Sequence, residues 1–331
     1  MCEKRGKIVL LPLCIAFILF TVKTSARSIT EKEKTRLRDS MEHRSSAPLT
    51  IDASFTKKAI TMPEAAKRKK EERLERTKKL REETNSDTIS YGSFEIAMPD
   101  GSEIRLSETR LRIGTGLRLR DDTTIFANTE KTETLSETTI INTGYEKDSK
   151  RYEIDHKWKD LSIWTGRKWG GRQILRFGKV DENIVTDILS FYFDRSLGSR
   201  SKNKSFLHNS TAVVDGNAVD EIECINSENS KPVYRISLDS DDWQICRKIV
   251  WYDEKTGLVS EIVEYKEFSK AKGSGELFPH LVIRRYFDEV GEEEKVETIN
   301  VTNVTLGLSI PDEVFKVDVP EEYSIIDYTN L

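Results

Sequence analysis

The chain has 331 residues, of which 37% are hydrophobic, and its 53 Lys and Arg against 57 Asp and Glu give a net charge of −4. This apolar content can bury the core of one or two domains, which excludes a wholly disordered or fibrous protein. The slight acidic excess also argues against a nucleic-acid-binding protein, because phosphate backbones are bound by basic surfaces.

The N-terminus has the organisation of a secretory signal. A basic stretch at residues 4–7 precedes an apolar run over 8–20, and small residues follow at 24–26. This order predicts a signal peptide over residues 1–26, cleaved after Ala26, and therefore a periplasmic or secreted protein. The alternative is an uncleaved membrane anchor, although the apolar run is shorter than the ~20 residues that cross a bilayer comfortably.

The next two segments are polar. Residues 27–62 are rich in Ser and Thr and show no clear period, which predicts a flexible leader. Pro63 then opens a run of Ala, Lys, Glu, Arg and Leu that favours a helix over 63–84. Leu74 and Leu80 are its only large apolar residues, so we expect a charged and largely solvated helix. A spacer or docking role for this helix is the alternative.

Strand signals begin near residue 88. The segments "ISYGSFEIAM" and "SEIRLSETRLRI" surround a Pro-Asp-Gly turn, and this pattern predicts a β-hairpin. Further β-rich runs follow through a Thr-rich stretch at 129–143 and through the region 151–180, which holds three of the five tryptophans. We therefore expect a sheet over this part of the chain.

One helix interrupts the strands. In "DENIVTDILSFYF", residues 181–193, apolar side chains recur at helical spacing and Asp181 can cap the start. The face expected to press on the rest of the protein is formed by Ile184, Val185, Ile188, Leu189 and Tyr192.

The C-terminal half returns to strands. Six β-rich segments between residues 218 and 306 are joined by short polar connections, which predicts an antiparallel meander because parallel strands need long crossovers. In "PVYRISLD", Tyr234, Ile236 and Leu238 share one face, and Ile249 and Trp251 share one face of the following strand. The opposite faces are also partly apolar, as expected of a curved sheet covered on its concave side.

Two cysteines, Cys224 and Cys246, remain after the signal is removed. An oxidising compartment would permit a disulfide between them. The alternative is a pair of small buried side chains, and the sequence leaves both readings open because a bridge depends on the separation of the two Cα atoms.

Three segments of the C-terminal half resemble a known family. They are "GNAVDEIECI" followed by "VYRISL", the hairpin "IVWYDEKTGLVSEIVEY" at 249–265, and the ending "IPDEVFKVDVPEEYSIIDY" at 310–328. Together they resemble the outer-membrane lipoprotein carrier superfamily, which is LolA/LolB-like and includes the periplasmic regulator RseB. The resemblance spans residues 88–328 and is strongest in the last third.

The resemblance implies a mainly β (α+β) fold. Over 88–328 we expect a strongly curved antiparallel sheet, an incomplete β-barrel around an apolar cavity with a helical lid, preceded by the charged helix at 63–84. By the same resemblance the 181–193 helix is the lid; the alternative is a helix that seals the core permanently.

The resemblance also implies a function, which is to hold the acyl chains of a lipid or lipoprotein in the cavity. The expected ligand-binding residues are the 181–193 helix face together with Tyr234, Ile236, Leu238, Ile249 and Trp251. The same side chains would equally form a closed core. A second hypothesis is an RseB-like envelope sensor or scaffold that binds a membrane-anchored protein and transports no cargo.

Catalytic and metal-binding patterns are sparse. The four histidines are scattered without the spacing of a zinc site, and no Gly-x-Ser-x-Gly nucleophile motif occurs. We therefore expect no metal, no cofactor and no enzymatic activity, and no nucleic-acid partner.

Overall fold

The structure is a computed structural model that describes residues 26–45, 50–84, 95–114, 118–143, 149–165 and 204–329. The expected signal peptide and the expected lid helix lie outside these residues. The described helices are α1 (Glu31–Ser45), α2 (Pro63–Thr84) and the short 3-10 helix η2 (Asp312–Phe315). Within the described ranges, neither long helix combines the length and apolar character needed to span a membrane.

The rest of the described chain is mostly strand. The strands are β1 (Arg27–Ser28), β2 (Ile51–Thr61), β3 (Ile96–Ala97), β4 (Glu103–Ile113), β5 (Leu119–Phe126), β6 (Thr134–Asn142), β7 (Lys150–Asp155), β8 (Asp160–Thr165), β9 (Lys204–Val214), β10 (Asn217–Asn226), β11 (Pro232–Asp239), β12 (Cys246–Tyr252), β13 (Val259–Lys270), β14 (Lys272–Gly273), β15 (Leu277–Phe287), β16 (Glu293–Leu306) and β17 (Ser324–Asp327).

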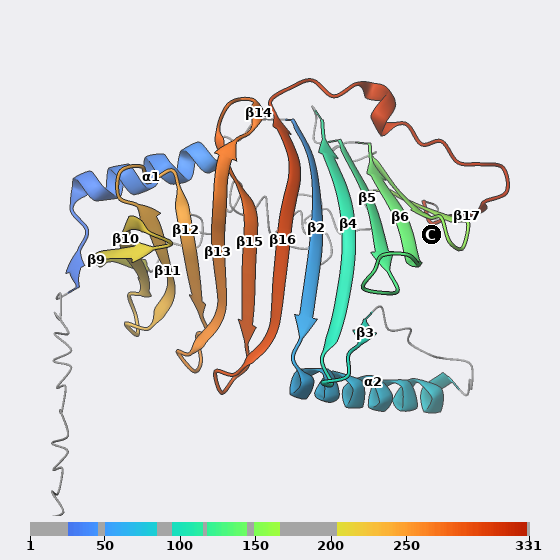
Figure 1. The fold of residues 1–331 in the computed structure, drawn as a ribbon, viewed down its shortest axis with the longest axis horizontal. Coiled ribbons are helices and arrows are strands. Elements are labelled where there is room, and N and C mark those ends of the chain that lie inside the picture. Colours follow the sequence, from blue (N-terminus) through green and yellow to red (C-terminus); the bar gives the residue numbers. More distant parts are fainter. Residues whose placement is uncertain are drawn as a thin grey trace, which may run out of the picture.

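These strands form one long sheet. Its order is β1-β9-β10-β11-β12-β13-β15-β16-β2-β4-β5-β6-β7-β8-β17, with β3 beside β4 and β14 beside β16 (Figure 1). All pairs are antiparallel except β8–β17 and β14–β16. Among the described strands no pairing joins β17 to β1 or β9, so the sheet stays open. The prediction of a mainly β fold built on a curved antiparallel sheet is confirmed.

The segment 27–62 is not the flexible leader that we expected. It contains β1, α1 and β2, and β2 pairs with β16 on one side and β4 on the other along its whole length. Ile51, Ala53 and Phe55 alternate toward the core and are buried. Lys57 and Lys58 interrupt this apolar alternation, which is why the sequence reads as polar. The sheet domain therefore begins well before residue 88.

One face of the sheet carries the main hydrophobic core, and we call it the inner face. Directly paired residues of neighbouring antiparallel strands point to the same side. Ile222, Ile236, Ile249 and Val263 are successive partners across β10, β11, β12 and β13, and all four are buried. The core continues through the successive partners Tyr265, Val282 and Ile299 on β13, β15 and β16, and through Phe55 of β2, which pairs with the buried Val301.

The two long helices lie at opposite ends of the strands (Figure 1). Helix α1 crosses one end of β10–β13 and contributes Leu37 to the core. Helix α2 is the helix predicted over 63–84; it buries Ala65 and Ala66 and forms an ion pair from Arg68 to Glu294 of β16. Its surface is otherwise charged, as the sequence indicates.

The hairpin between β12 and β13 reverses at Asp253 and Gly257. The Asp253 carboxylate accepts hydrogen bonds from the backbone N–H groups of Lys255 at 3.0 Å and Thr256 at 2.7 Å. Gly257 has φ of +75°, which a residue without a Cβ adopts freely. The turn residues singled out in the sequence therefore close this hairpin.

Cys224 and Cys246 are both buried and are not joined to each other. Strand β11 lies between their strands, so the two Cα atoms are separated by about two strand spacings of ~4.8 Å, beyond the reach of a disulfide. A bulge also turns Cys246 to the inner face, opposite Leu238. The structure thus favours the reading of two small buried side chains.

The segment between β16 and β17, residues 307–323, runs past the ends of β2, β4 and β5 to the far edge of the sheet, and we call it the C-terminal strap (Figure 1). Arg118 forms an ion pair with Asp312 at 2.8 Å, and Arg120 donates to the Val314 carbonyl at 3.2 Å. Phe315 is buried against Gly114, where an added Cβ would lie 2.7 Å from the ring. Gly114 therefore provides the space that the Phe315 ring occupies.

We expect Phe315→Ala to lower the free energy of unfolding by about 3 kcal/mol, because it leaves a cavity beside Gly114. Chemical denaturation measures this change. Val290→Ala, at a side chain that is 74% exposed, is the matched control and should leave the midpoint unchanged. Equal midpoints for the two variants would show that the strap does not hold the sheet.

Candidate ligand-binding site

The structure brings together the described residues of the expected binding site. Tyr234, Ile236, Leu238 and Ile249 lie on the inner face and are buried, with exposures between 0 and 4%. Trp251 is partly buried beside them, with its ring centroid 5.2 Å from that of Tyr234. The lid stays a prediction, because its expected residues lie outside the described part of the chain. These are Ile184, Val185, Ile188, Leu189 and Tyr192.

The apolar surface is wider than the sequence indicated. It extends from β10 through β16 to β2 and includes Val263, Tyr265, Val282 and Ile299. The sequence of β15, "LFPHLVIRRYF", does not show that Val282 belongs to the apolar surface, because Val282 shares its face with Arg284 and Tyr286. Residues 278–286 show no period-two alternation, because both faces carry apolar and polar side chains, so the sequence offers no local signal for this face.

A group of ionisable residues ends the apolar surface near α2, and we call it the charged cluster. It lies on β2, β13, β15 and β16 and consists of Lys57, Glu261, Arg284, Tyr286, Lys295 and Glu297. Register places it on the inner face, since Arg284 pairs with the buried Val263 and with Glu297. The inner face therefore changes from apolar to charged along the strands.

Glu297 is the centre of the charged cluster. Its carboxylate lies 2.9 Å from the Lys57 ammonium and 2.5 Å from that of Lys295, and it accepts a hydrogen bond from the Tyr286 hydroxyl at 3.1 Å. Burial by itself would raise the pKa of Glu297, but the two ammonium groups outweigh it and hold the pKa at about 2. Burial lowers the pKa of Lys57 and raises that of Tyr286.

A second polar area, the polar patch, lies on the inner face of β4, β5 and β6. Thr109, Asp121, Thr123 and Asn142 form it, and Thr123 donates a hydrogen bond to Asp121 at 2.7 Å. Burial, aided by the charge of Asp122, raises the pKa of Asp121 to about 6. The sequence did not reveal this patch, because "DDTTIF" is typical of an exposed polar strand.

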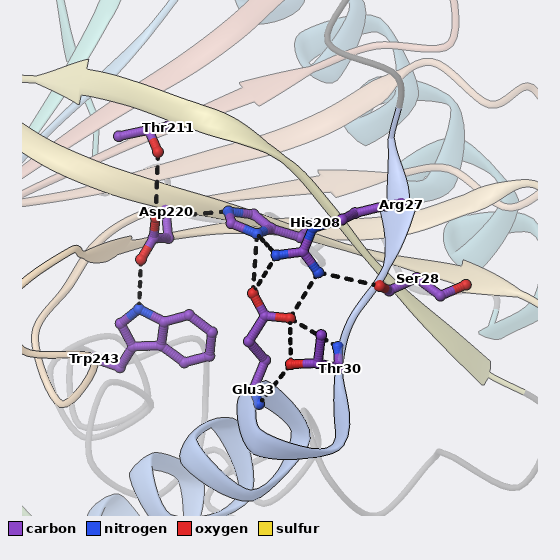
Figure 2. Close-up of polar contacts among 8 residues, drawn as sticks. All are labelled: Arg27, Ser28, Thr30, Glu33, His208, Thr211, Asp220 and Trp243. Atoms are coloured by element: carbon purple, nitrogen blue, oxygen red, sulfur yellow. Dashed lines mark hydrogen bonds and ion pairs between the residues drawn. The ribbon is translucent and has the colours of Figure 1, made fainter.

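Another set of polar contacts fixes the start of α1 (Figure 2). Thr30 and Glu33 form a capping box, in which the Thr30 N–H donates to Glu33 at 2.7 Å and the Glu33 N–H donates to the Thr30 hydroxyl at 3.3 Å. The guanidinium of Arg27, with further hydrogen bonds from Thr30, lowers the pKa of Glu33. These contacts define where the helix begins.

His208 of β9 connects α1 to the sheet (Figure 2). Its Nδ1 lies 3.2 Å from Glu33, and its Nε2 lies 3.5 Å from Asp220, which also accepts from the Trp243 indole at 2.7 Å. The hydroxyls of Thr30 and Thr211 reach the carboxylates and not the imidazole. The drawn residues therefore lack the hydroxyl–imidazole pair of a hydrolase and hold α1 in place.

A groove of about 640 Å³ lies between α1 and the turn at 241–244. Its lining mixes both signs of charge, with Lys32 and Arg36 beside Asp39, Asp241 and Asp242. The Arg36 guanidinium lies 4.6 Å from the centre of the Trp243 ring. Across the described ranges, no cluster of three or more His, Cys, Asp or Glu side chains could hold a metal ion.

No family model and no curated protein matches the sequence. Among solved structures, the fold is similar to a DUF1329 family protein from Desulfovibrio piger, with TM-score 0.43 and 10% identity over 86% of this chain and 96% of that one. A LolA superfamily protein from Nitrosomonas europaea gives TM-score 0.40 and 10% identity over 86% and 97%. The MucA/MucB complex of Pseudomonas aeruginosa gives TM-score 0.27 and 10% identity over 87% of this chain and 61% of that one.

We expect Glu297→Gln to destabilise the protein by about 3 kcal/mol at neutral pH, because it leaves buried Lys57 without its counter-ion. The low pKa of Glu297 stabilises the fold above the unfolded value near ~4.3, and this contribution is lost as the pH falls toward 2. Denaturation of the variant across that range should show a weaker acid dependence. Glu289→Gln, in an exposed turn, is the control; an unchanged acid slope in Glu297→Gln would contradict the assignment.

Asp121→Asn should act in the opposite direction. The raised pKa of Asp121 means that its ionisation destabilises the fold as the pH rises from about 4 to about 6. We expect the free energy of unfolding of the variant, minus that of the native chain, to be about 3 kcal/mol higher at pH ~7.5 than at pH ~4. Thermal unfolding at both pH values tests this, with exposed Asp318→Asn as control. A stability difference between the variant and the native chain that does not change with pH would contradict a raised pKa for Asp121.

Proposed function

We propose that the chain is an exported, non-enzymatic binding protein that holds an acyl chain, of a lipid or a lipoprotein, against the inner face of its sheet. One observation supports the proposal: a continuous cluster of buried apolar side chains lines the inner face of an open sheet from β10 to β2. Each CH₂ group removed from water there would contribute about 0.8 kcal/mol. The signal-like N-terminus and the C-terminal motifs support the same function.

The ligand would reach this face at the end that α1 covers. Ile29 and Leu37 are the buried hydrophobic side chains of residues 26–40. Polar contacts also hold this segment, among them the hydrogen bond from Ser40 to the Trp243 carbonyl and the contacts around His208. A helix that buries so few apolar side chains can leave the sheet at little cost in apolar burial, so α1 is suited to admit a chain.

One feature favours the second candidate, a scaffold for an envelope protein. Strand β17 pairs with β8, and among the described strands it has no partner on its other side. Ile325 and Ile326 are 62% and 42% exposed on it. An extended segment of a membrane-anchored partner could add to such an edge.

The full chain, expressed with its signal and purified after export, should contain lipid detectable by mass spectrometry and should take up a fluorescent acyl probe. We expect Trp251→Ala, at a partly buried position, to weaken probe binding about tenfold, and Ile236→Glu to abolish it. Val213→Glu, at a side chain 72% exposed, should bind normally. Circular dichroism verifies that each variant folds.

Absence of both lipid and probe uptake would contradict acyl-chain binding. A stoichiometric envelope protein that co-purifies without lipid, and that Ile325→Asp releases, would establish the scaffold function in its place.

A further inference from the structure

The charged cluster adjoins the apolar surface directly. Trp251 is the cross-strand partner of Glu261, and Val263 is the partner of Arg284, so apolar and charged side chains alternate at the boundary. Lys57 follows the buried Phe55 on the same face of β2. A molecule lying along the apolar surface would therefore meet the charged cluster at one end.

Among the described residues at this end, cations exceed anions. Arg105 of β4 stands opposite Ala59 on the same face, and Glu103 stands opposite Thr61. Lys69 of α2 is near enough to Lys295 and Glu103 to interact electrostatically with both. The cations are Lys57, Lys69, Arg105, Arg284 and Lys295, and the carboxylates are Glu103, Glu261 and Glu297. The nearby Arg73–Glu95 ion pair of 3.1 Å adds no net charge.

Part of this positive charge lies open to solvent. The side chains of Glu297 and Lys57 are only 2% and 11% exposed, but that of Lys295 is 31% exposed. Burial and the charge of Lys295 both lower the pKa of Lys69, as expected where positive charge is in excess. An anion placed beside these two ammonium groups would relieve that repulsion.

Stability does not account for the charged cluster. Buried ion pairs are often no more stabilising than apolar side chains of the same volume, because removing charges from water is costly. The inner face could have continued as the apolar surface to which Ile222, Ile236 and Ile249 contribute on β10–β12. A functional requirement for charge explains the change better.

We propose that the charged cluster, together with Lys69 and Arg105, binds the phosphate headgroup of an anionic amphiphile whose acyl chain lies on the apolar surface. This rests on the proposed function and adds the headgroup class to it. Lys295 and Lys69 donate hydrogen bonds to the phosphate oxygens at the open side, and Glu297 keeps Lys295 oriented. Tyr286, whose ring centre is 5.2 Å from the Lys295 ammonium, lines the path to the chain.

Competition against the fluorescent acyl probe tests this headgroup site with three compounds. They are 1-palmitoyl lysophosphatidic acid, 1-palmitoylglycerol with the same chain and no charge, and glycerol 3-phosphate with no chain. We expect the phosphate lipid to compete at about tenfold lower concentration than the neutral lipid, a preference that high salt reduces. Glycerol 3-phosphate alone should compete poorly.

Two variants localise the effect. Lys69→Ala removes a half-buried ammonium outside the buried ion pairs, and Lys295→Ala removes the one beside Glu297. Both should reduce the preference for phosphate while leaving the affinity for 1-palmitoylglycerol unchanged. Lys266→Ala is the matched control, because Lys266 lies on the other face of β13, 3.1 Å from Asp215.

Each outcome bears on a different claim. Equal competition by the two lipids would overturn the headgroup site and leave acyl-chain binding intact. Glycerol 3-phosphate as potent as the phosphate lipid would indicate a site for free phosphate and overturn the lipid assignment. No binding of any acyl compound would overturn both proposals.

Discussion

The sheet depends on the pairing of β2 with strands on both of its sides. β4–β8 and β9–β16 form two groups of strands, and β2 is the strand between them, with every residue from Ile51 to Thr61 paired to both β16 and β4. Its inward residues supply both kinds of surface, since Phe55 belongs to the hydrophobic core and Lys57 to the charged cluster. Without this strand the inner face would be two separate surfaces.

Much of the fold could be predicted from the sequence, because strands with period-two alternation and Gly- or Asp-containing turns are recognisable locally. The six C-terminal strands, the Asp253–Gly257 turn and helix α2 are in this group. Strand β2 could not be predicted in this way, because the burial of Lys57 depends on its ion pair with Glu297, which is distant in the sequence. The Thr30–Glu33 capping box was a local signal for α1 that a polar composition obscured.

The candidate site was predictable only in its apolar part. Tyr234, Ile236 and Leu238 are visible as one face of one strand, and their partners Ile249 and Trp251 follow from the next. The charged cluster and the polar patch are assembled by pairing among strands distant in sequence, and each member by itself is an ordinary exposed-looking residue. Cross-strand register, which one sequence does not state, is what gives Glu297 and Asp121 their opposite pKa shifts.

The placement of β2 also bears on how the chain is made. Ile51 pairs with Leu306 and Thr61 with Lys295. Strand β2 is synthesised early, but it cannot complete its pairing until β16, one of the last strands, has been synthesised. Such long-range pairing makes folding slow, and the apolar side chains of the inner face remain incompletely packed until β16 has been synthesised. A chain of this topology is open to aggregation for most of its synthesis, and a route that keeps it unfolded until it is complete would suit it.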